Sequence, residues 1–337
     1  MSWITGSTCC WQQEGSCSRS HCLGINTGTR RGHIRLKIAS VCVTLFALSG
    51  VPSNGQISAA ERATLFKQGT IRALILTGQN NHDWRSTTPL LRTMLLNTGR
   101  FDVRVNEEPS GMTSATLAPY DVVILNYNGP RWGRTAEKAL EDFVRSGKGL
   151  VGVHGANWAF SGLVVLADGS VPTEIFEAPW TEYKRMIGGV WSDKPPASGH
   201  APRHRFQVKI VDGESSITRG LAASFDVDDE LYHNIHMAPD VHVLATAYDD
   251  PGNKPEPAAD SAPRTTDGTT VNASAPKWPH LDMNPTGKDE PILWTIRYGN
   301  GRTFYTALGH DIQAMEMPGF SGTFVRGVEW AATGTVK

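Results

Sequence analysis

A histidine occupies a position where many enzymes carry a nucleophile. In the segment GLVGVHGANWAF, residues 149–160, an apolar strand runs into a turn of small residues, and His154 lies at the bend. A side chain at such a bend is presented to a pocket beside the N-terminus of the next helix. An imidazole there can act as a base, an acid or a metal ligand. The alternative is a histidine that only hydrogen-bonds a backbone carbonyl.

Polar and aromatic residues also follow other predicted strands. GQNNHDW follows the first strand, NYNGPRW the third and GHD the last. Ligands of open α/β sheets bind beyond the carboxyl ends of the strands, so we expect these residues to converge. Each asparagine has the alternative of only shaping its turn. The residues expected at this edge are Asn80, His82, Trp84, Asn128, Trp132, Asn157, Trp158, His310 and Asp311.

Two further segments offer titratable groups. In DDELYHNIH, residues 228–236, Glu230 precedes the apolar Leu231 and Tyr232. This context predicts either a buried carboxylate with a raised pKa or an ion pair with an arginine. His200 lies in SGHAPRHRF, within an insertion that we expect to fold over the site.

The elements that must position these residues alternate along the chain. Continuous apolar runs predict strands that are covered on both faces, and helical periods separate several of them. The predicted strands cover residues 72–78, 101–105, 120–129, 149–155, 205–211 and 240–248, with a hairpin over 291–310. The predicted helices cover residues 58–68, 87–99, 135–149 and 319–334, the second with Thr88 as its cap and Pro89 in its first turn. This order predicts a doubly wound α/β sheet with helices on both faces.

The N-terminal residues differ in composition from the rest. Residues 1–50 contain all five cysteines and the apolar run IASVCVTLFALSG, which has the length of a signal-peptide core. We expect a leader over 1–50, with cleavage before Gly50, and therefore a secreted or periplasmic protein without cysteine. A start codon nearer Arg30 is an alternative, and the Arg30–Arg31 pair matches a twin-arginine signal poorly.

The remaining organisation and the charge limit the functional classes. A lead-in helix and linker over 51–69 precede a single domain over 70–335, in which residues 250–290 read as a loop insertion rich in Pro, Asp, Thr and Asn. With 32 basic and 33 acidic residues the net charge is −1. We therefore expect no nucleic-acid partner and no membrane span in the mature chain.

Several segments together resemble the ThuA-like family, which is named for trehalose utilisation. They include ALILTGQNNHDWRSTTPLL, GKGLVGVHGANWAF, DELYHN and PILWTIRYGNGRTFYTALGHD. The family is similar in fold to class I glutamine amidotransferases, a flavodoxin-like, mostly parallel sheet. The resemblance implies a role in sugar metabolism, and His154 at the position of the amidotransferase cysteine implies that amidotransfer is absent. The chain has SSIT, residues 215–218, where the family often has HPIT.

Two hypotheses of different classes follow. In the first, the protein is an enzyme that acts on a disaccharide or keto-sugar by acid–base chemistry, as a hydrolase, lyase or isomerase. In the second, it is a sugar-binding accessory module without catalysis. The expected catalytic residues are His154, Glu230, His310 and Asp311. The residues expected to bind the sugar are Asn80, His82, Trp84, Asn128, Trp132, Asn157, Trp158 and Tyr232.

Metal assistance is an open alternative within the first hypothesis. His154, His200 and His310 are the candidate ligands, and Zn²⁺ is the first choice because it suits neutral imidazole. No HxH or HExxH spacing fixes such a site, so a metal-free pair of His154 and Glu230 stays open. The sequence leaves the oligomeric state undetermined.

Overall fold

The computed structural model describes residues 65–162, 164–172, 175, 177–253 and 283–337. The expected leader, the five cysteines and most of the expected insertion lie outside the described residues. Of the predicted helix over 58–68, only residues 65–68 are described, and they form turns. The described helices include none that is long and apolar enough to cross a membrane.

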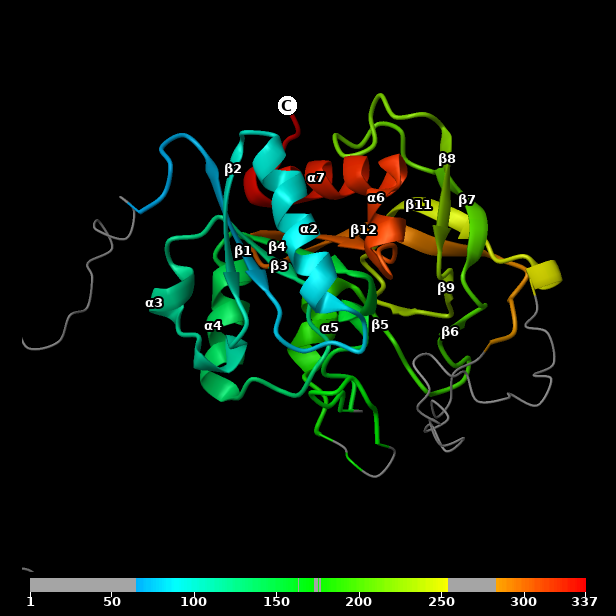
Figure 1. Cartoon of the computed structure of the whole chain (residues 1–337), viewed down its shortest axis with the longest axis horizontal. Coiled ribbons are helices and arrows are strands. Elements are labelled where there is room, and N and C mark those ends of the chain that lie inside the picture. The colour runs from blue at the N-terminus through cyan, green and yellow to red at the C-terminus, as the bar shows by residue number, and fades with distance from the viewer. Residues whose placement is uncertain (1–64, 163, 173–174, 176, 254–282) are drawn as a thin grey trace, which may run out of the picture. The chain divides into compact units, whose positions relative to one another are not determined.

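A nine-stranded sheet forms the centre of the fold, in the order β2-β1-β3-β4-β13-β12-β11-β7-β8 (Figure 1). Strands β12 and β7 run antiparallel to their neighbours, and the other seven share one direction. The α/β class with a mostly parallel sheet is therefore confirmed. The strands are β1 (Ile71–Leu76), β2 (Phe101–Asn106), β3 (Val122–Leu125), β4 (Gly149–Val153), β7 (His204–Ile210), β8 (Ser224–Asp229), β11 (His242–Tyr248), β12 (Asp289–Tyr298) and β13 (Gly301–Thr306).

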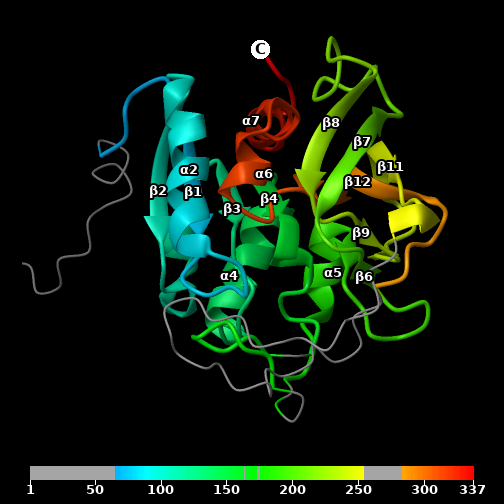
Figure 2. The same ribbon diagram turned by 45° about the vertical axis from the view of Figure 1, so that its right-hand side comes forward.

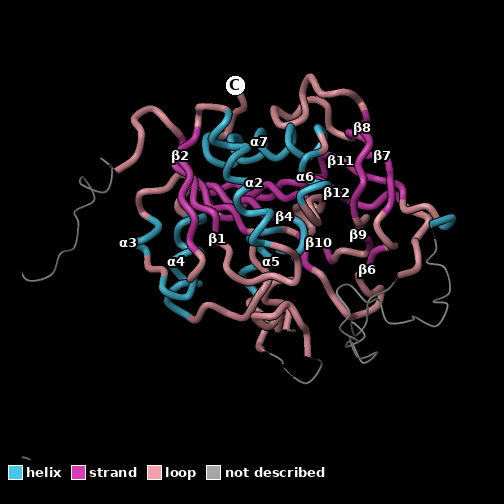
Figure 3. The backbone as a smooth tube through the Cα atoms, in the orientation of Figure 1, coloured by secondary structure: helices cyan, strands magenta, loops and turns pink. Residues whose placement is uncertain are grey.

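Helices cover both faces of this sheet. Along β1, Leu74 and Leu76 face a core shared with α4 and α5, whereas Ala73 and Ile75 face a core shared with α2 and α7. Figure 3 shows α7 on one side of the sheet and α4 and α5 on the other. The alternation explains the continuous apolar runs, because each strand buries both faces. The helices are α2 (Trp84–Asn97), α3 (Ser114–Leu117), α4 (Arg134–Arg145), α5 (Thr181–Ile187), α6 (Ile312–Glu316) and α7 (Pro318–Thr333).

Helix α2 begins earlier than the sequence predicts. Asp83, not Thr88, is its N-cap, and the Asp83 carboxylate accepts the N–H of Ser86. Pro89 consequently lies inside the helix, where it lacks the N–H that would bond to the carbonyl of Arg85. Thr88 was predicted as the cap because Pro89 follows it, and proline is favoured in the first turn of a helix.

The antiparallel half of the sheet curls back toward the parallel half. Figure 2 shows β7 and β8 rising beside α6 and α7, against which β8 packs. The end of β8 thereby returns to the end of β13, although three strands separate them in the sheet order. The sequence analysis missed β8 and two short ladders that lie near this junction. These ladders pair β6 (Gly199–His200) with β9 (Tyr232–His233), and β5 (Gly189–Val190) with β10 (His236–Met237).

The expected insertion over 250–290 extends too far at its C-terminal end. Asp289 and Glu290 already belong to β12, and Glu290 is buried. The described residues before the gap include the short 3₁₀ turn η3 (Pro251–Asn253). The carboxylate of Glu290 accepts hydrogen bonds from Thr286 and Asn234, so this residue belongs to the packed structure and not to a surface loop.

Candidate functional site

His154 sits at a strained bend that its neighbours hold in place. It opens the 3₁₀ turn η2 (His154–Asn157) directly after β4, with a φ of 46° that non-glycine residues rarely adopt. The Nδ1 atom of His154 lies 2.8 Å from the carbonyl oxygen of Ala307, and the hydroxyl of Tyr305 donates to the backbone carbonyl of His154. Tyr305 lies at the end of β13 and Ala307 directly follows that strand, so the neighbouring strand fixes the bend and the direction of the imidazole.

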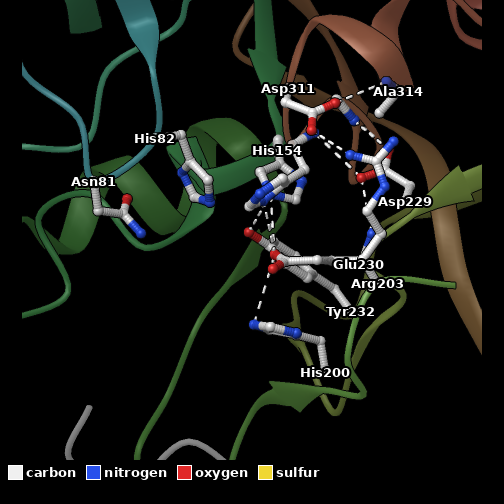
Figure 4. Close-up of polar contacts among 12 residues, drawn as sticks. Asn81, His82, His154, His200, Arg203, Asp229, Glu230, Tyr232, Asp311 and Ala314 are labelled. Carbon is white, nitrogen blue, oxygen red and sulfur yellow. Dashed lines mark hydrogen bonds and ion pairs between the residues drawn. The ribbon is translucent and has the colours of Figure 1, made fainter. Parts of the chain in front are cut away.

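Three histidines and one carboxylate meet at the carboxyl edge of the sheet. His82 follows β1, His154 follows β4, His310 follows β13 and Glu230 follows β8. Each offers one possible ligand atom, and the four atoms lie within 4.8 Å of one another. The Glu230 Oε2 lies 3.1 Å from Nδ1 of His310 and 3.5 Å from Nε2 of His154. Figure 4 shows His82, His154 and Glu230 converging.

The outer ring nitrogens of His154 and His82 are held by hydrogen bonds. Because a carbonyl only accepts, Nδ1 of His154 is protonated, and in the tautomer with one ring proton Nε2 carries the lone pair. Nδ1 of His82 lies 3.0 Å from Oδ1 of Asn80, which also accepts the backbone N–H of His82. In metal-ligating histidines the nitrogen that does not bind the metal is typically held by a hydrogen bond in this way.

Tyr232 and His200 complete the surroundings of Glu230. The Tyr232 hydroxyl lies 2.7 Å from Nε2 of His154 and donates to it. Nε2 of His200 lies 3.6 Å from Oε2 of Glu230, while its Nδ1 donates to the carbonyl of Ala201. The β6–β9 ladder pairs the two residues, so a short local structure places both groups beside the cluster.

Burial and the charge of Glu230 act in opposite directions on the imidazoles of the site. Burial lowers the pKa of His82 well below its usual value, and the neighbouring histidines lower it further. Burial also lowers the pKa of His200, against the opposing charge of Glu230. Burial alone would raise the pKa of Glu230, but the close imidazoles of His154, His310 and His200 hold it well below its usual range. The pKa of His310 is raised, because Glu230 outweighs the effect of burial.

This result corrects both sequence interpretations of Glu230. Its pKa is lowered rather than raised, because the imidazoles compensate for its burial. Its ion-pair partners among the described residues are histidines and not an arginine, since the nearby Arg203 is paired with Asp228 and Asp311.

Asp229 positions two of the four groups, a role that the sequence analysis missed. Its carboxylate accepts the backbone N–H groups of Gly309 at 2.7 Å, His310 at 3.2 Å and Glu230 at 2.8 Å. These hydrogen bonds link the end of β8 to the residues after β13. One buried carboxylate therefore holds the segments that carry Glu230 and His310 next to each other. The adjacent acids in DDE were the available signal, but nothing in the spacing distinguished the positioning residue from Glu230.

A family model described as trehalose utilisation, ThuA, matches residues 72–331. The chain belongs to the ThuA family. A ThuA-like protein from Parabacteroides merdae has a similar structure, with 28% identity, a TM-score of 0.60, and coverage of 80% of this chain and 92% of that one. A ThuA-like protein from Bacteroides uniformis shares the fold at 19% identity and a TM-score of 0.53, over 86% and 97% of the two chains. A comparison with curated proteins gave no match.

In this ThuA protein the two acids that follow a histidine cap helices. Asp83 caps α2, and Asp311 caps α6 by accepting the N–H of Ala314 at 2.9 Å. Asp311 also pairs with Arg203, and Figure 4 shows it directed toward Arg203 and Ala314. The structure thus places Asp311, expected as a catalytic residue, outside the group of converging ligand atoms, because the carboxylate caps a helix.

Compared with the predicted metal set, the group of four lacks one member and has two that were not predicted as ligands. His154 and His310 belong to the group of four, but His200 does not, since it lies beyond Glu230. His82, expected to bind substrate, takes its place. Glu230 was predicted only as a catalytic group, and its carboxylate is one of the four converging groups.

The predicted sugar-binding residues separate into different environments. Asn80 orients His82, and the Asn128 amide donates to Oδ1 of Asn81 at 2.8 Å. The Asn157 amide is fully buried, and within the described residues it has no hydrogen-bond partner. For all three asparagines, contact with a sugar stays a prediction.

The three tryptophans that were predicted to bind the sugar also lie in different environments. Trp84 begins α2, where the Arg85 guanidinium lies 4.3 Å from the centre of its ring. Trp132 is buried against Tyr127, Phe160 and Trp180, which leaves its ring in the core rather than on an open surface. Trp158 lines a cavity, which is described below.

Proposed function

We propose that this ThuA protein is an enzyme that acts on a disaccharide, or on its keto derivative, by acid–base chemistry at the histidine cluster. The convergence of three imidazoles and one ionised carboxylate carries this proposal. Membership of a family described by trehalose utilisation supports a sugar substrate. The alternative expected from the sequence, a sugar-binding module without turnover, would use the same residues only as hydrogen-bonding groups.

We further propose that His82, His154, Glu230 and His310 hold a divalent cation, with Zn²⁺ as the first choice. A set of three imidazoles and a carboxylate is chemically suited to zinc, and the fixed outer N–H groups of His82 and His154 suit ligation. When bound, such a cation would polarise a carbonyl or hydroxyl oxygen of the sugar.

Tyr232 and His200 are the groups beside this set that can exchange protons. The Tyr232 hydroxyl contacts His154, and the unprotonated Nε2 of His200 faces Glu230. Both side chains are therefore placed next to the ligand set and outside it. A hydroxyl donor and a neutral imidazole can act as acid and base for proton transfer next to a sugar carbonyl.

Secretion or a periplasmic location remains part of the proposal. It rests on the apolar run within residues 38–50 and on the cysteine-free sequence that follows it. Fractionation of expressing cells and N-terminal sequencing of the purified protein test it, and an intact N-terminus in the cytoplasmic fraction would contradict it.

Elemental analysis of the purified chain tests the metal, before and after incubation with excess zinc. We expect one equivalent of metal in the wild type and in His242→Ala, whose exposed imidazole pairs with Asp212 away from the site. We expect loss of metal in His154→Ala and His82→Ala, with folding verified by thermal melting. Turnover of trehalose and a keto-disaccharide is then measured in each. Turnover without metal would leave acid–base catalysis alone, and sugar binding without turnover would support the binding-module alternative.

A further inference from the structure

A cavity lies beside the candidate site, and none of the four converging groups lines it. Its volume is about 430 Å³, within the range of pockets that bind small molecules. The segment after η2, the start of α5 and the segment after β5 form its walls. The lining residues used below are Trp158, Lys184, Trp191, Ser192, Asp193 and Lys194.

Trp191 forms the wall between this cavity and the candidate site. Its ring centre lies 5.0 Å from that of Tyr232 and 6.2 Å from that of His200. Its backbone N–H donates to the carbonyl of Asn157, in the same turn that begins with His154. One side chain therefore separates the cavity from the two groups that can exchange protons.

The lining combines flat aromatic surface with polar groups of both charges. The rings of Trp158 and Trp191 stack at an interplanar angle of 26°, with their centres 5.6 Å apart. Lys184, Lys194 and Asp193 lie around them. Charges of both signs favour a ligand that presents donors and acceptors without a strong charge of its own, and aromatic surface favours an apolar ring face. A neutral pyranose ring has both properties.

We propose that this cavity is a subsite for a neutral pyranose, and that it holds the ring of a disaccharide that does not react. The inference rests on the proposed function for its disaccharide. It deepens that function, because it assigns recognition of one sugar ring to the Trp158–Trp191 cavity and chemistry on the other ring to the histidine cluster. The subsite would also bind a single neutral pyranose when the cluster is disabled.

Calorimetric titration of the full chain with trehalose and with methyl α-glucoside tests the subsite. We expect binding of both sugars by the wild type and by His154→Ala, and at least tenfold weaker binding by Trp158→Ala. Trp330→Ala is the matched control, because Trp330 packs on the α7 side of the sheet, and it should bind as the wild type does. Asp193→Ala is a second cavity variant with a smaller packing effect, and it should also weaken binding.

The outcomes separate this proposal from the proposed function. Binding that is lost in His154→Ala but kept in Trp158→Ala and Asp193→Ala would assign the sugar to the cluster and overturn the subsite. Absence of binding of both sugars by the folded wild type would also overturn it, whatever the metal analysis gives. Binding lost in both cavity variants and kept in His154→Ala would support the subsite even if no turnover is found.

Discussion

The Tyr232 hydroxyl donates a hydrogen bond to Nε2 of His154 at 2.7 Å, and this nitrogen is the one that a cation would need. The ring direction is independent of Tyr232, because Ala307 and Tyr305 fix the other side of His154. A cation at the cluster would therefore displace the hydroxyl from His154 and free it to contact a substrate.

Tyr232→Phe should separate metal binding from catalysis. Removal of one competing hydrogen bond, worth about 1 kcal/mol, should leave zinc affinity unchanged or raise it up to about fivefold. Turnover should fall by about 10²-fold or more, because a proton-exchange group is lost. Zinc titration and steady-state kinetics measure both, with the exposed Tyr248→Phe as the control. A variant with weakened zinc binding and unchanged catalysis would refute this role.

Gly155→Ala should weaken metal binding through His82. A Cβ at residue 155 would lie 2.9 Å from both Cε1 and Nδ1 of His82, so the imidazole must move from its bond to Asn80. We expect at least about tenfold weaker zinc binding, as is typical when the support of a ligand is lost. Gly322→Ala, where a Cβ meets no neighbour within 4 Å, is the control for the substitution itself. Equal zinc affinity in the two variants would contradict the prediction.

Substitutions of Asp311 should affect stability more than catalysis. Asp311→Ala removes the N-cap of α6 and should lower the free energy of unfolding by about 1 kcal/mol. Asp311→Asn retains a capping oxygen and should keep turnover within a few-fold of the wild type, measured beside urea denaturation. A folded Asp311→Asn protein with a loss of about 10²-fold in turnover would restore the catalytic role expected from the sequence.

Asp249→Asn should destabilise the protein in a pH-dependent way. Asp249 and His233 are fully buried, with Nδ1 and Oδ2 2.8 Å apart, and Asp249 also accepts the N–H of Thr286. Burial alone would raise the pKa of Asp249, but these contacts hold it below its usual value. Because the folded pKa is the lower one, the carboxylate stabilises the fold above the unfolded pKa of about 3.9, and this contribution disappears as the pH falls through the folded pKa.

Urea denaturation at neutral and acidic pH measures this effect. We expect Asp249→Asn to lose about 1.5–3 kcal/mol near neutral pH, and the difference from the wild type to shrink on acidification below about pH 4. Asp226→Asn, an exposed substitution on β8, should change little at either pH. A difference that grows as the pH falls would reverse the sign and contradict the assignment.

The sequence predicted the parallel half of the fold well, because local pattern determines it. The buried runs of β1, β3 and β4, and the predicted inward face of α7 with Phe320, Phe324 and Val328, are confirmed. The strand β8 was missed because SFDVDD is mostly polar, and its burial pattern alternates only weakly. The segment forms a strand because it pairs with β7, and no local sequence pattern predicts this pairing.

The candidate site was predictable as a set of strand ends but not as a geometry. His154 and His310 were expected at the same edge from the parallel strand order, and the structure brings them together. The position of Glu230 depends on the curl that returns β8 to β13 and on the Asp229 carboxylate. The sequence likewise could not decide whether the acid after a histidine faces a substrate or caps a helix, as Asp83 and Asp311 do.

The curl of the sheet also bears on when the site can form during folding. Its four groups span residues 82 to 310, and the carboxylate comes from the antiparallel half while the histidines come from the parallel half. Contacts so distant in sequence close large loops and form late. An intermediate with only one half of the sheet folded lacks the set, so a cation that binds the complete set stabilises the finished fold over such intermediates. Metal binding would then distinguish the fully folded chain from a partly folded one.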